Sequence, residues 1–185
     1  MALQLFHLDK TTRKYMLEEL VYDMMNAKVY YSARLTNLGI NKYLLLLRQA
    51  CESGDEKTLA RELAQTGLMK RKEKRRHRSG AFIEVKVPKN ACELLADGEF
   101  NKLYIRGLCR VAIEEGKAIE VYRAKNADFP REQSNAVIGK RLDPEQLLEA
   151  LRNQNYLATF LGIHPSVNVG LSIRLVKETK YLQAS

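Results

Sequence analysis

The 185-residue sequence has no apolar run that approaches the roughly 20 residues of a membrane-spanning helix. Its first residues carry neither the basic segment nor the long apolar segment of a secretory signal peptide. At 45% hydrophobic and 29% charged residues, the composition is that of an ordinary soluble protein with a sizeable core. We therefore expect a soluble cytoplasmic protein without a membrane partner.

Cysteine and histidine are scarce. The cysteines are odd in number, far apart and set in apolar stretches of helical pattern: Cys51, Cys92 and Cys109. We expect them to be reduced core residues rather than parts of a disulfide or metal site. The histidines share no metal-binding spacing with one another or with a cysteine pair: His7, His77 and His164. The sequence therefore predicts no metal site and no cofactor.

Recognisable catalytic and base-reading motifs are missing as well. No G-x-S-x-G nucleophile motif occurs, and Gly139-Lys140-Arg141 lacks the preceding glycine and the following Ser or Thr of a Walker phosphate loop. No helix-turn-helix, RRM, KH or zinc-finger pattern is found that would support base-specific recognition. These absences favour a protein that is not an enzyme.

What the chain does have is a concentrated positive charge. Of the net charge of +9, residues 67–80 contribute +6, against +1 for residues 1–66 and +2 for residues 81–185. A compact cation attracts a polyanion and releases its counterions, so nucleic acid, DNA or RNA, is the partner that the charge favours. If the source were eukaryotic, residues 70–76 would also match a nuclear localisation signal.

Apolar periodicity and capping residues predict several helices. Four polar residues stand where an N-cap is expected, opening helices that end near residues 26, 52, 66 and 152: Asp9, Asn41, Asp55 and Asp143. Asn90 is expected to cap a short helix to residue 96. A longer helix over residues 98–115 is apolar around most of its circumference, so we expect it to be central.

Alternating apolar and polar residues predict four strands, over residues 29–35, 81–87, 118–123 and 171–176. A helix separates the second strand from the third, so we expect these two to pair in parallel as a right-handed βαβ unit. A polar loop is expected over residues 124–141.

The predicted fold class is therefore α+β, in three regions. A helical region covers residues 1–67, a solvated basic connector residues 68–80, and a region with a small sheet containing the βαβ unit residues 81–185.

A second set of cations lies on the long helix. Lys102, Arg106 and Arg110 recur every four residues and form one stripe, which extends the candidate basic surface. The competing interpretation is that Arg106 and Arg110 pair with carboxylates such as Glu99, Glu114 or Glu120. The full set of candidate nucleic-acid-binding residues is Lys70, Arg71, Lys72, Lys74, Arg75, Arg76, Arg78, Arg106, Arg110, Arg123, Lys140 and Arg141.

The main functional hypothesis is sequence-independent binding of the nucleic-acid backbone, without catalysis. A first alternative is a structural subunit of a homo-oligomer or a larger, nucleic-acid-containing assembly. It depends on apolar residues near the termini that a small monomer buries incompletely: Leu3, Leu5, Phe6, Leu175, Val176, Tyr181 and Leu182.

A second alternative is a metal-dependent nuclease. Glu84 and Lys86 are two residues apart on a predicted strand, the pattern of the PD-(D/E)xK nucleases, in which an acid and a lysine on one strand face hold a metal and the attacking water. The competing interpretation is a simple cross-strand charge pair.

Overall fold

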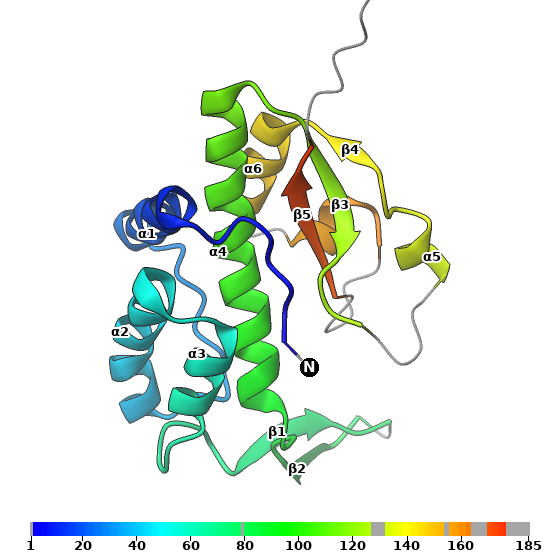
Figure 1. The fold of residues 1–185 in the computed structure, drawn as a ribbon. Coiled ribbons are helices and arrows are strands. Elements are labelled where there is room, and N and C mark those ends of the chain that lie inside the picture. The colour runs from blue at the N-terminus through cyan, green and yellow to red at the C-terminus, as the bar shows by residue number, and fades with distance from the viewer. Residues whose placement is uncertain (1, 79, 127–131, 154–155, 164–169, 177–185) are drawn as a thin grey trace, which may run out of the picture. The chain divides into compact units, whose positions relative to one another are not determined.

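The computed structural model describes residues 2–78, 80–126, 132–153, 156–163 and 170–176 (Figure 1). The chain divides into two compact units, and the second is inserted into the sequence of the first. We call residues 1–28 together with 101–185 the terminal unit, and residues 29–100 the hairpin unit. These boundaries differ from the three expected regions, because the first helix belongs with the end of the chain. No described helix is long and apolar enough to cross a membrane.

The terminal unit combines helices with a small antiparallel sheet. Its sheet has the order β4-β3-β5, with β3 in the centre (Figure 1). Its elements are α1 (Lys10–Met25), the second half of α4 (Ala91–Glu115), β3 (Ile119–Arg123), α5 (Glu132–Asn135), β4 (Arg141–Leu142), α6 (Pro144–Arg152), α7 (Leu157–Phe160) and β5 (Leu171–Leu175).

The core of the terminal unit lies between its sheet and its helices. Ile119, Val121 and Ile173 of the sheet and Leu108 of α4 are fully buried. α1 crosses α4 closely at Gly107, where an added Cβ would lie 2.9 Å from the Thr12 carbonyl oxygen. Any larger residue at this position would force the two helices apart.

The hairpin unit contains two further helices and a two-stranded sheet. Its elements are α2 (Asn37–Ser53), α3 (Glu56–Leu63), β1 (Lys72–Arg76), β2 (Phe82–Lys86) and the first half of α4. Tyr43, Leu47, Leu59 and Leu63 bury the apolar faces of α2 and α3. Gly39 allows the chain to pass close to α2, because an added Cβ would lie 2.1 Å from the Leu68 carbonyl oxygen.

The α+β class is confirmed, and so are several local predictions. Three expected N-caps accept hydrogen bonds from the first turn of their helices: Asp9, Asp55 and Asp143. The strands expected over residues 81–87, 118–123 and 171–176 are β2, β3 and β5. All three cysteines are free and lie in helices, with Cys51 and Cys109 buried and Cys92 half-buried. Burial raises the pKa of the Cys92 thiol.

The prediction of a βαβ unit is wrong. Every strand pairing among the described residues is antiparallel, and β2 pairs with β1 rather than with β3. The missed element is β1 itself, since residues 72–76 are all charged and carry no apolar alternation. With a partner next to it in sequence, β2 needs no crossover connection to β3.

Other local predictions are also corrected. Residues 29–35 form no strand beyond one bridge between Leu35 and Met69. α2 begins at Asn37, capped by Thr36 rather than by Asn41. The two helices expected over residues 90–96 and 98–115 are one, because a single glycine at position 98 costs only about 1 kcal/mol in a helix. The polar loop over residues 124–141 contains α5 and the start of β4.

A candidate nucleic-acid-binding hairpin

The basic run forms one strand of a β-hairpin. β1 and β2 pair in the register Lys72 with Lys86, Lys74 with Glu84 and Arg76 with Phe82. At the turn, the His77 amide donates to the Ala81 carbonyl and the Gly80 amide to the His77 carbonyl, at 2.8 and 2.9 Å. Gly80 has a φ of +87°, a backbone conformation that glycine adopts without steric cost. The expected connector is therefore a regular element.

The register sorts the charged side chains onto two faces. Directly opposed residues share a face, and neighbours along a strand point to opposite faces. Glu73, Arg75, Ile83 and Val85 therefore form one face. The other, which we call the cationic face, consists of Lys72, Lys74, Arg76, Phe82, Glu84 and Lys86.

The face that carries Glu73 is tied to the rest of the hairpin unit. Arg34 donates two hydrogen bonds to the Glu73 carboxylate, at 2.7 and 3.1 Å. These bonds and the charge of Arg34 lower the pKa of Glu73. The Lys70 side chain donates to the Ala33 carbonyl at 2.8 Å. The hairpin is therefore anchored to its unit through Glu73 and through Lys70, which lies just before β1, and neither residue belongs to the cationic face.

The cationic face carries an excess of positive charge. Lys72 pairs with Glu84 at 2.6 Å, and both side chains are more than half exposed. The side chains of Lys74, Arg76 and Lys86 are exposed and have no ion-pair partner among the described residues. Four cations and one carboxylate give this small face a charge of +3, which is available to an anionic partner.

Phe82 is an aromatic residue on the otherwise charged cationic face. Its side chain is 72% exposed, and it lies directly opposite Arg76. No aromatic ring contacts it among the described residues. The sequence placed Phe82, Glu84 and Lys86 on one strand face, but it gave no partner strand. The glycine after a charged run and before an alternating strand is the signal that would have indicated a hairpin.

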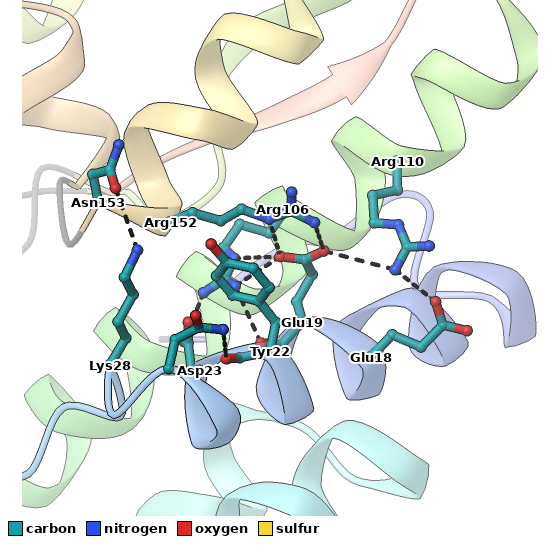
Figure 2. Close-up of polar contacts among 10 residues, drawn as sticks. Glu18, Glu19, Tyr22, Asp23, Lys28, Arg106, Arg110, Arg152 and Asn153 are labelled. Carbon is teal, nitrogen blue, oxygen red and sulfur yellow. Dashed lines mark hydrogen bonds and ion pairs between the residues drawn. The ribbon is translucent and has the colours of Figure 1, made fainter.

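The arginines of α4 have a different environment. Arg106 is fully buried and donates to Glu19 at 2.7 and 2.9 Å and to Asp23 at 2.6 Å, both on α1 (Figure 2). Arg110 lies 2.6 Å from Glu18. The interpretation that these arginines pair with carboxylates is confirmed, but with partners on α1. The carboxylate of Glu120 pairs with Arg174 instead.

Glu19 is the centre of this buried cluster. Burial alone would raise its pKa, but hydrogen bonds from Arg152 and Arg106 and the charges of both outweigh burial and lower the pKa. The Tyr22 ring lies close to both guanidinium groups, with its centre 5.8 Å from the Arg106 Cζ and 4.6 Å from the Arg152 Cζ (Figure 2). Three arginines face three carboxylates, so the cluster has no excess charge and stabilises the packing of α1, α4 and α6.

The remaining candidate cations lie in the terminal unit. Arg123 donates to Ser134 Oγ at 3.1 Å and to Asn135 Oδ1 at 2.7 Å, which fixes its side chain against α5. Lys140 and Arg141 are exposed. These three residues belong to a different unit from the hairpin. The candidate residues between positions 70 and 78 lie together on or beside β1.

Glu84 lacks the surroundings of a metal centre. Its carboxylate pairs with Lys72, as the charge-pair interpretation of this strand predicts. The nearest acid on the partner strand, Glu73, points to the opposite face and is bound by Arg34. Across the described part of the chain, no three His, Cys, Asp or Glu side chains come together as a metal site. His164 lies outside the described residues.

Comparisons with protein-family models, with curated proteins and with solved structures find no match to this chain. The geometry and charge of the hairpin are therefore the observations that bear on function.

Proposed function

We propose that the protein binds the backbone of nucleic acid through the cationic face of the β1–β2 hairpin, without sequence preference and without catalysis. The observation that supports this most strongly is the strand register. It gathers Lys74, Arg76 and Lys86, three cations without an ion-pair partner among the described residues, on one exposed face.

The shape of the hairpin suits such a ligand. At about 3.4 Å per residue, the row from Lys72 to Arg76 is about 14 Å long. A two-stranded ribbon is narrow enough to enter the major groove of a duplex or to lie along a single strand. Main-chain hydrogen bonds between β1 and β2 fix the backbone that carries the cations, so less backbone freedom is lost on binding than in an unstructured basic tail.

The proposed binding surface includes fewer residues than the set of candidate cations predicted from the sequence. We leave out Arg106, because its guanidinium group is fully buried among carboxylates. Arg110 is engaged by Glu18 and Arg123 by α5. Lys70 and Arg75 also have partners, at Ala33 and Glu73. Lys72, Lys74, Arg76 and Lys86 form the central part of the surface, with Arg71 and Arg78 beside it.

The test compares two triple variants with the same change in charge. Lys74, Arg76 and Lys86 are replaced by Gln in the first variant. In the control, the replaced residues are Lys42, Lys57 and Arg61, which are exposed on α2 and α3 of the same unit. Fluorescence anisotropy measures the affinity for labelled oligonucleotides as a function of salt.

The two variants should differ clearly. In the first, the slope of log K against log salt becomes less negative by about 2 to 3, at 0.7–0.9 per lost phosphate contact. The control should keep most of the wild-type slope. Equal slopes in both variants would show that general charge, and not the cationic face, attracts the ligand.

Assembly is a second candidate function, favoured by an exposed apolar strip on α1. Val21, Met24 and Met25 are 50%, 49% and 82% exposed, and their spacing places them on one side of the helix. Of the apolar residues near the chain ends, Phe6 is 58% exposed and packs on Tyr122.

The other terminal residues give less support. Leu3, Leu5, Leu175 and Val176 are half-buried, and Tyr181 and Leu182 lie outside the described residues. Light scattering with and without nucleic acid tests this candidate, since a monomer at high concentration under both conditions would contradict it.

A further inference from the structure

The most exposed large apolar group of the hairpin lies within its cationic face. Phe82 is 72% exposed, whereas Val85 on the opposite face is half-buried. Arg76 is its directly opposed neighbour, and Lys74 is a diagonal one. Side chains at such positions have Cβ atoms about 5 and 7 Å apart, so two cations of β1 border the phenyl ring. Glu84, the next residue on the same face of β2, is paired with Lys72. Packing within the hairpin unit does not account for an aromatic ring at this position.

An aromatic ring bordered by cations matches the chemistry of an unpaired nucleotide. The ring offers a flat surface to a base, and the neighbouring cations meet the phosphates on either side of it. In a duplex the bases already stack on one another, and their faces are not accessible to a side chain unless the helix is opened. A single strand presents its base faces freely.

We infer that Phe82 stacks on a base and that the ligand of the hairpin is single-stranded nucleic acid. This inference rests on the proposed backbone binding and adds the ligand class. The ring contributes affinity that does not depend on salt, while the cations contribute the salt-dependent part. Because every base has a flat face, this recognition remains independent of sequence.

The experiment uses the whole chain and three substitutions at one position. Phe82→Leu keeps an apolar side chain but removes the ring, and Phe82→Tyr keeps the ring. Phe82→Trp adds a fluorescent reporter, because the chain has no tryptophan. Phe6→Leu is the matched control, since Phe6 is an exposed phenylalanine of the terminal unit. Thermal melts check that each variant is folded, and the Phe82 substitutions should leave the midpoint unchanged because this side chain is 72% exposed.

The probes are a labelled oligo-dT of about 16 nucleotides and a mixed-sequence duplex of the same length. Wild-type protein should prefer the single strand. Phe82→Leu should weaken that binding about 5- to 150-fold with an unchanged salt slope, and Phe82→Tyr and Phe6→Leu should bind as wild type. The single strand should quench the fluorescence of Phe82→Trp more strongly than the duplex does.

The outcomes separate this inference from the function on which it rests. Loss of oligo-dT affinity only in Phe82→Leu supports stacking. Unchanged oligo-dT affinity in Phe82→Leu overturns the stacking inference. If the triple variant at Lys74, Arg76 and Lys86 still loses affinity in that case, the proposed backbone binding is retained. A loss confined to the duplex would mean that Phe82 acts as a wedge between base pairs, and this too overturns the single-strand assignment. If wild-type protein binds neither probe, the proposed function fails as well.

Discussion

Replacing Arg106 by Met tests whether the buried cluster in the terminal unit stabilises the fold. Its guanidinium group is fully buried and makes four hydrogen bonds, three to the carboxylates of Glu19 and Asp23 and one to the Glu19 carbonyl. In Arg106→Met, the apolar packing is largely kept, but Asp23 loses the arginine that neutralises it. Glu19 retains Arg152.

The magnitude follows from burial. Removing one partner of a buried ion pair costs about 3–5 kcal/mol, because it leaves an uncompensated charge. For a chain of this size, that corresponds to a fall of the melting midpoint by about 6 to 20 °C. Arg110→Met is the comparison: Arg110 and Glu18 are 29% and 42% exposed, so the loss should be about 1 kcal/mol or less.

Urea and thermal unfolding followed by far-UV circular dichroism measure both variants. A third variant, Arg106→Leu with Glu19→Leu and Asp23→Leu, should recover part of the stability, since the buried charges are removed together. Arg152 loses Glu19 in this variant, but its side chain is 30% exposed and stays in contact with water, so the recovery should be partial. If Arg106→Met is no less stable than Arg110→Met, the buried cluster does not stabilise the fold as expected. Nucleic-acid binding should be unchanged in folded Arg106→Met, although the sequence predicts Arg106 as a binding residue.

Three further predictions concern pH, packing and salt. The pKa of Glu19 is lowered in the folded protein, so its ionised carboxylate stabilises the fold above the unfolded pKa of about 4.3. This stabilisation is lost as the pH falls through the folded pKa. Glu19→Gln should therefore make the free energy of unfolding depend less on pH on the acid side. Gly39→Ala should destabilise the protein by about 1–3 kcal/mol, because the added Cβ collides with the Leu68 carbonyl oxygen. Gly98→Ala should stabilise it by about 0.5–1 kcal/mol, because an added Cβ there meets nothing within 4 Å. Denaturant titrations measure both changes. For wild-type protein, the slope of log K against log salt should reach about −5 in anisotropy titrations, and a slope near zero would contradict backbone binding.

The parts of the fold that depend on local chemistry could be predicted from the sequence. Asp9, Asp55 and Asp143 cap helices because a carboxylate next to free amides is stabilising whatever the tertiary structure is. The strand over residues 82–86 was predictable from its alternation, and the basic run was evident as the dominant charge.

The parts that depend on contacts between distant residues could not. Residues 72–76 form a strand because β2 supplies the hydrogen bonds, and their charged side chains are tolerated because most of them are exposed to solvent. The burial of Arg106 depends on Glu19, which lies 87 residues earlier, and no spacing rule links the two. Phe82 was placed on the correct strand face, but its cationic neighbours became visible only with the pairing of β1.

The insertion of residues 29–100 into the terminal unit has a consequence for the newly made chain. α1 leaves the ribosome before α4, so the carboxylate of Glu19 has no partner until Arg106 has been made, 87 residues later. At 5–20 residues per second, that delay is about 4 to 17 seconds. The hairpin unit is continuous in sequence and can fold within this interval. We therefore expect synthesis to be the period in which α1, with its exposed Val21, Met24 and Met25, is most open to chaperones and to aggregation.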